Sequence, residues 1–130
     1  MRRLILAIGL AAIVATQATA SSRKERFERS LEMLAPTERL EQICDYAAMQ
    51  KIGKAANHFH PDRAISDART STIVIKDTIT ANGAAFRSRN KWYELTYTCT
   101  AAPNHLKVLS FDYKIGPEIP EKKWSAYHLW

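Results

Sequence analysis

The sequence predicts a small α+β domain in which one or two N-terminal helices pack on a four-stranded antiparallel meander sheet. Three observations support this fold class. Apolar residues recur with the helical period over residues 37–52, whereas they alternate with polar residues between about residues 73 and 115. The only two cysteines, Cys44 and Cys99, fall one in each segment, which predicts a helix-to-strand disulfide.

The first 20 residues have the pattern of a secretory signal peptide. Arg2 and Arg3 precede an apolar run of about a dozen residues, and residues 18–20, Ala-Thr-Ala, match the small-x-small site of signal peptidase. A membrane-spanning helix needs roughly 20 apolar residues, so we expect cleavage after Ala20, and no later segment is apolar enough to span a membrane. The mature protein is therefore expected in the periplasm or outside the cell.

The mature chain would have 110 residues, which is the size of one domain. Loss of Arg2 and Arg3 lowers the formal net charge from +6 to +4, a mild excess that is spread along the chain. Nucleic-acid binding needs a more concentrated basic stripe, and an exported protein rarely meets nucleic acid. We therefore expect no nucleic-acid partner. An acidic periplasmic protein or an anionic envelope component fits the charge and the compartment better.

Residues 21–36 are highly charged and are predicted to form a short helix or a partly disordered arm. Phe27, Leu31 and Leu34 are spaced i, i+4 and i+7, which gives a single narrow apolar stripe. Such a stripe buries little surface. The segment is therefore expected to dock loosely on one α+β domain formed by residues 37–130.

The main helix is predicted between Pro36, which suits a first helical turn, and Gly53, which suits a helix end. Three acidic residues, Glu38, Glu41 and Asp45, are predicted to lie on its solvated side, where they also favour the helix dipole. Acid–base chemistry by paired carboxylates is the alternative interpretation of these residues. The apolar stripe of this helix consists of Leu40, Ile43, Cys44, Ala47, Ala48 and Ile52.

The four predicted strands follow, because the apolar period changes to two. Residues 73–75 are β-branched, Asn82-Gly83 is the preferred pair for a two-residue hairpin turn, and residues 102–104 predict a second turn. One set of alternating positions is expected to face the core, namely Tyr93, Leu95, Tyr97, Cys99, Leu109, Phe111, Tyr113 and Ile115.

The segments on either side of the strands are predicted to be irregular. Residues 55–70 are polar and contain Pro61, so they are expected to be a loop with at most one or two helical turns within residues 62–68. Residues 117–130 contain two prolines and then aromatic residues at helical spacing. A last helical turn is expected to close the core with Trp124, Tyr127 and Trp130.

In an oxidising compartment, two cysteines most simply form one intramolecular disulfide. The Cys44–Cys99 bond would close a loop of some 55 residues, for which chain entropy gives about 4 kcal/mol of stabilisation. A redox-active pair would have the C-x-x-C spacing, which this chain lacks. A structural bond is therefore expected, with intermolecular pairing as the alternative.

Four neighbouring residues form the best candidate for a binding surface. Arg87, Arg89 and Lys91 occupy alternate positions and are followed by Trp92. Such a basic patch with an aromatic edge suits an anionic ligand or an acidic protein. Strand-edge charges that prevent sheet-to-sheet aggregation are the alternative interpretation.

A weaker candidate is the segment that contains His58, His60 and Asp62. In an extended chain these alternate residues would project to one side, where two imidazoles and a carboxylate could hold a metal ion. Pro61 breaks regular structure here, and a solvated loop is the simpler interpretation. We therefore predict no metal and no cofactor.

No catalytic motif points to an enzyme. The chain has no G-x-S-x-G elbow and no phosphate-binding glycine loop among its 4 glycines. The leading hypothesis is a non-enzymatic binding or accessory module for an acidic protein or an anionic envelope component. The alternative is a small periplasmic enzyme, or a metal- or ligand-binding protein, that uses the His58–Asp62 segment.

Several strings resemble a bacterial family called domain of unknown function 930, in the same order along residues 34–130. The resemblance implies a Gram-negative, periplasmic setting and a small α+β domain that contains both cysteines, but no activity, ligand or catalytic residue. Ala35 departs from the acidic helix cap expected in similar sequences, at a cost of around 1 kcal/mol. The matching strings lie at residues 39–45, 61–64, 67–68, 83–88, 91–93, 108–113, 119–120 and 124.

Overall fold

A computed structural model describes residues 15–130, with side chains from residue 22 onward. Most of the predicted signal peptide, residues 1–14, lies outside the described residues. Within them, no helix is long and apolar enough to cross a membrane. The elements are α1 (Ala15–Glu32), α2 (Pro36–Lys54), β1 (Pro61–Ile65), β2 (Ile73–Ile75), β3 (Thr78–Ser88), β4 (Lys91–Ala101), β5 (Val108–Glu118) and the 3-10 turns η1 (Glu121–Lys123) and η2 (Ser125–Tyr127).

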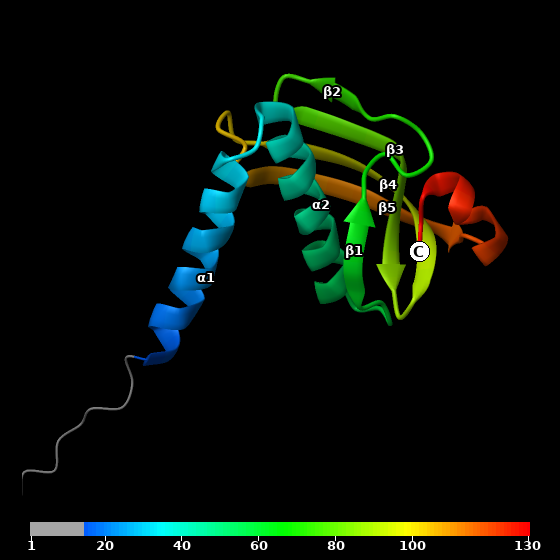
Figure 1. The fold of residues 1–130 in the computed structure, drawn as a ribbon, viewed down its shortest axis with the longest axis horizontal. Coiled ribbons are helices and arrows are strands. Elements are labelled where there is room, and N and C mark those ends of the chain that lie inside the picture. Colours follow the sequence, from blue (N-terminus) through cyan, green and yellow to red (C-terminus); the bar gives the residue numbers. More distant parts are fainter. Residues whose placement is uncertain (1–14) are drawn as a thin grey trace, which may run out of the picture.

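The predicted α+β fold is confirmed, with five strands instead of four (Figure 1). All strand pairs are antiparallel. The sheet order is β1-β3-β4-β5, and the short strand β2 pairs with β3 beyond the end of β1. The strands β2 to β5 follow one another as the predicted meander, and β5 is an edge strand.

The extra strand, β1, corrects the prediction for residues 55–70. Residues 61–65 form a strand, and residues 62–68 contain no helical turn. Pro61 can occupy the first position of this strand because β1 is an edge strand, where a missing N–H costs little. The sequence did not predict this strand because the segment is polar. The structure agrees with that composition, since none of the five residues is fully buried.

The predicted turn at Asn82-Gly83 is wrong, because β3 runs through both residues. They form a bulge in the pairing of β3 with β4. A Cβ atom on Gly83 would overlap Thr70, so this glycine lets the loop before β2 cross close to β3. The turn between β3 and β4 is Arg89-Asn90, with φ of 51° and 64°, as a type I′ turn requires.

The helix α2 follows its prediction closely, with Pro36 at its first turn and its end just beyond Gly53. All residues of the predicted apolar stripe are buried. Leu31 of α1 is buried in the same core. This core fills the space between α2 and one face of the sheet, and it includes Leu40 and Ile52 of α2 and Phe86 and Leu95 of the sheet.

A second, smaller core lies on the other face of the sheet, where the C-terminal segment covers β3 and β4 (Figure 1). Trp92, Ile119 and Leu129 are buried there. Trp124 and Tyr127 pack against them, whereas Trp130 is 57% exposed. The aromatic tail therefore closes a second core and does not extend the first.

The predicted disulfide is confirmed between Cys44 of α2 and Cys99 of β4, with a Cα–Cα distance of 6.0 Å. Both residues are fully buried. The bond joins α2 to the central part of the sheet and closes a loop with a sequence separation of 55. A structural role follows, and no cysteine is left free in the chain.

Candidate functional site

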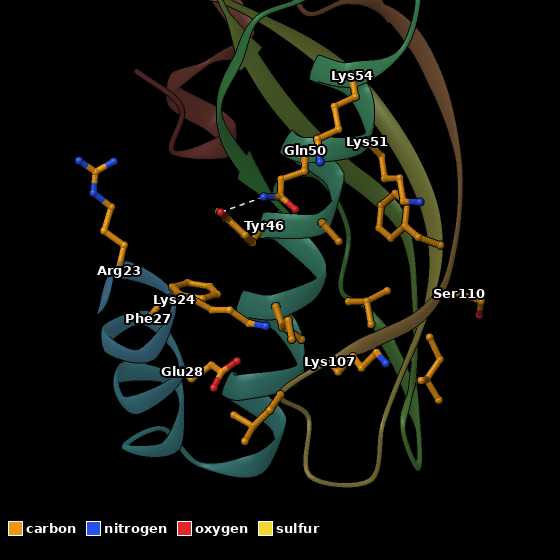
Figure 2. Close-up of a pocket in the computed structure, with 16 residues that line it drawn as sticks. Arg23, Lys24, Phe27, Glu28, Tyr46, Gln50, Lys51, Lys54, Lys107 and Ser110 are labelled. Atoms are coloured by element: carbon orange, nitrogen blue, oxygen red, sulfur yellow. Dashed lines mark hydrogen bonds between the residues drawn. The ribbon is translucent and has the colours of Figure 1, made fainter. Parts of the chain in front are cut away.

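A groove of about 740 Å³ lies between α1, α2 and the edge strand β5 (Figure 2). Figure 1 shows why it forms, because α1 diverges from α2 toward its N-terminal end. The lining comes from α1, α2, the β4–β5 loop and the start of β5. It consists of Arg23, Lys24, Phe27, Glu28, Ile43, Tyr46, Ala47, Gln50, Lys51, Lys54 and residues 106–111.

The floor of this groove is apolar. Ile43 and Ala47 are buried residues of α2, one turn apart, and the short side chain of Ala47 adds depth between larger neighbours. The ring of Phe27 of α1 lies against that of Tyr46 in a tilted arrangement, with ring centroids 4.6 Å apart, and so closes the side between the helices. The β5 side adds apolar residues from Leu106 to Phe111.

The rim is basic. Five lining residues are Lys or Arg and one, Glu28, is acidic. Lys24 extends from α1 toward α2, Lys51 and Lys54 lie toward one end of the groove, and Lys107 lies toward the other (Figure 2). Within the described residues, none of the five basic side chains forms a salt bridge or a side-chain hydrogen bond. Their charges are therefore available to a ligand.

Arg39 fixes α1 against the rest of the domain. Its guanidinium donates to the backbone oxygens of Leu31 at 2.9 Å, Glu32 at 3.1 Å and Leu34 at 3.1 Å. It also donates to the backbone oxygen of Asn104 in the β4–β5 loop at 2.9 Å. Carbonyl groups at a helix end lack intrahelical partners, so one side chain satisfies the end of α1 and joins it to the loop that ends the groove.

The same loop is held by His105, whose side chain is 9% exposed. One ring nitrogen lies 2.7 Å from the backbone oxygen of Pro36, and the other lies 2.8 Å from Asp77. Both partners are hydrogen-bond acceptors, so both bonds form together when both nitrogens carry hydrogen. His105 thus joins the start of α2 and the β2–β3 turn to the β4–β5 loop.

The basic surface predicted on β3 and β4 is largely tied into the fold. Arg87 donates to both carboxylate oxygens of Asp62, at 3.1 and 2.8 Å, and to the backbone oxygen of Trp130 at 3.2 Å. The hydrogen bonds from Arg87 hold the pKa of Asp62 below its ordinary value. Lys91 lies 3.5 Å from Glu118, and Arg89 is exposed in the β3–β4 turn.

Trp92 is not part of that surface, and its expected place at the aromatic edge is corrected. The side chain is fully buried in the second core. Its indole N–H donates to the backbone oxygen of Trp130 at 3.0 Å. The C-terminal segment covers this face of the sheet, which the alternation along β4 alone did not reveal.

The residues of the predicted metal alternative have other contacts. Asp62 is paired with Arg87, and the ring of His58 lies 4.3 Å from that of Phe59. The His60 backbone N–H donates to the Ser88 hydroxyl at 2.8 Å. Among residues 15–130, no group of three or more His, Cys, Asp or Glu side chains is arranged to hold a metal ion.

Asp45 was expected on the solvated side of α2, and this expectation is wrong. It is 9% exposed and accepts a hydrogen bond from the Tyr97 hydroxyl at 2.9 Å. Burial raises the pKa of Asp45 from 3.8 to about 7, against the opposing effect of the bonds from Tyr97 and the Ser66 backbone. Burial also raises the pKa of Glu41, and the neighbouring Asp67 adds to that shift.

A family model described as Domain of Unknown Function (DUF930) matches residues 31–129. The chain belongs to this family. The DUF930 match covers α2, all five strands and the C-terminal turns, but only the end of α1. No match was found among curated proteins or among solved structures.

The groove of this DUF930 protein could not be found from the sequence. Lys51 and Lys54 continue the helical spacing of Ile43 and Ala47, so the sequence indicates that these four residues lie along one side of the helix. This spacing is only a weak indication of a binding site. The opposite wall comes from β5 and the β4–β5 loop, more than 50 positions away in the chain. Only the packing of α2 on the sheet brings these two walls together.

Proposed function

We propose that this protein is an exported, non-enzymatic binding or accessory module that holds an anionic amphiphile of the cell envelope in its basic groove. One observation carries the proposal, namely an apolar floor enclosed by five basic residues that have no acidic partner among the described residues. Apolar pockets with a few convergent polar groups are the usual sites for small ligands.

The chemistry of the groove favours a ligand with both an apolar part and a negative charge. An exposed ion pair contributes only about 0–1 kcal/mol, so the charges alone would bind weakly and without much selectivity. Burial of apolar surface adds roughly 25 cal/mol for each Å², and the floor offers such surface. A ligand that has both an apolar part and a negative charge therefore gains from the apolar floor and from the basic rim.

Export is the second part of the proposal. The Cys44–Cys99 disulfide is consistent with an exported protein. We expect signal peptidase to cut after Ala20, which leaves Arg23 and Lys24 in the mature chain. N-terminal sequencing of the protein from a periplasmic fraction tests this cut. A mature chain that starts after Phe27 would remove part of the groove wall and contradict the proposal.

The test of binding uses anilinonaphthalene sulfonate, a fluorescent apolar anion, with the mature protein. The variant K51E/K54E/K107E reverses three charges of the rim, whereas R89E/K91E/K123E reverses three exposed charges elsewhere. We expect the first variant to weaken binding at least tenfold and the second to leave it within about twofold. Equal loss in both variants would show that net charge, and not the groove, determines binding.

The surface of Arg87, Arg89 and Lys91 remains the competing location for an anionic partner. Three of its contacts, from Arg87 to Asp62 and from Lys91 to Glu118, already use acidic groups of the same chain. Loss of binding confined to R89E/K91E/K123E would move the site to that surface and reject the groove.

A further inference from the structure

We infer that the ligand of the groove is a single-chain anionic lipid, such as a fatty carboxylate, whose acyl chain lies on the floor between α2 and β5. This inference rests on the proposed function and specifies the ligand class. Of the two negatively charged partners that fit the basic rim, a lipid and an acidic protein, it selects the lipid.

The shape of the groove suits one extended chain. The α2 residues that line it run from Ile43 to Lys54, which is about 16 Å at 1.5 Å per residue. Val108 to Phe111 of β5 form the other wall. A volume of about 740 Å³ is within the range of roughly 300–1,000 Å³ typical of small-molecule sites. The space is thus a concave site of small-molecule size and not a flat protein-binding surface.

The composition of the floor favours an acyl chain over a peptide. The floor residues Ile43, Ala47 and Phe27 have no polar side-chain group. Above them, the exposed Gln50 amide already donates to the Tyr46 hydroxyl at 2.9 Å. A peptide laid on Ile43, Ala47 and Phe27 would bury backbone N–H and C=O groups away from water. Each such group left without a partner costs about 1–3 kcal/mol, whereas an acyl chain has no such groups.

The position of the charges favours an anionic head group at the end of the groove. Lys51 and Lys54 are both exposed, one turn apart, in the last turns of α2. Their ammonium groups are free of partners among the described residues, and their methylene stems can cover the end of the chain. Lys24 crosses from α1 above the floor (Figure 2) and can contact the same ligand.

Calorimetric titration of the mature protein with laurate and with octanoate tests the inference. Each buried methylene contributes about 0.8 kcal/mol, or about fourfold in affinity, so laurate should bind far more tightly than octanoate. The variant A47F fills the floor and should abolish laurate binding, while the matched variant A126F, at an exposed position of η2, should not. If A47F does not fold, K51E/K54E must weaken laurate at least tenfold but leave the neutral-head dodecyl maltoside unchanged.

Three outcomes would overturn the inference in different ways. Binding of anilinonaphthalene sulfonate in the groove without binding of laurate would reject the lipid and retain the proposed function. Tight binding of a polyglutamate peptide, with no dependence on acyl chain length, would assign the groove to an acidic protein. Failure of every one of these anionic probes to bind would reject both the inference and the proposed function.

Discussion

The two faces of the sheet use basic side chains in different ways. On the face covered by the C-terminal segment, Arg87 is bonded to Asp62 and to the backbone of Trp130. On the face covered by α2, the basic residues that line the groove have no such partners among the described residues. A cluster of charges therefore indicates a binding site only when the fold leaves the charges unpaired.

The face of the sheet that α2 covers is also held by the Cys44–Cys99 disulfide. Removal of this bond is expected to have the largest effect on stability. The variant C44A/C99A should lower the free energy of unfolding by about 4 kcal/mol, because the bond restricts a long loop in the unfolded chain. Urea denaturation measures this loss. Hydrogen exchange should show a greater loss of protection in α2 than in residues 119–130, and an equal loss would show that the two faces open together.

The buried carboxylate of Asp45 predicts that stability depends on pH. The pKa of Asp45 is about 7 in the folded protein, whereas an exposed aspartate has its ordinary value of 3.8, so the folded protein binds the extra proton between these values. Stability should therefore rise as the pH falls from 8 to 5, by on the order of 3 kcal/mol. Asp62, whose pKa is lowered, acts in the opposite direction only below about pH 4.

The variant D45N is the control for this effect, since the amide oxygen can still accept from Tyr97 and the side chain cannot ionise. We expect the pH dependence between 8 and 5 to be largely lost in thermal or urea denaturation. An unchanged slope in D45N would assign the effect to other groups, Glu41 first because burial raises its pKa in the same direction.

Arg39 allows the groove wall to be loosened without touching the floor. The variant R39A removes four hydrogen bonds to backbone oxygens and should lower stability by about 2 kcal/mol. It should also weaken binding of anilinonaphthalene sulfonate, because Phe27 and Lys24 lose their fixed position. R39K should recover only part of both, since an ammonium group cannot match the planar guanidinium. Unchanged affinity in R39A would show that α1 is not a binding wall.

The smallest expected effects on stability distinguish a basic residue that is paired, Arg87, from two that are not, Lys51 and Lys54. R87A should cause a modest loss of stability that shrinks in high salt, because its ion pair with Asp62 is exposed. K51A and K54A should each change stability by less than about 1 kcal/mol, because these side chains have no ion-pair partners to lose among the described residues and interact only with the C-terminal end of α2. A clear loss of stability in K51A would show that the groove lysines are structural and weaken the assignment of a binding role.

Much of the fold was predictable because it depends on local patterns. The apolar period of α2, the alternation in β4 and the pairing of Cys44 with Cys99 all follow from residue spacing and a shared core. At the start of β5 the predicted alternation is wrong, because the pairing with β4 is irregular there and Val108 packs on the core, whereas Leu109 is 61% exposed. Two other local signals misled. Asn82-Gly83 is a bulge because Thr70 crosses above Gly83, and residues 61–65 form a strand because β3 offers an unpaired edge.

The candidate site was less predictable, for a physical reason. Burial of Trp92 depends on the C-terminal segment, and burial of Asp45 depends on Tyr97, which is 52 positions away. The family, the fold class and the disulfide could be predicted from the residues alone, since these depend on order and periodicity along the chain. Which charges are paired, and where a groove remains, became clear only from the folded chain, because long-range packing, and not local pattern, brings those groups together.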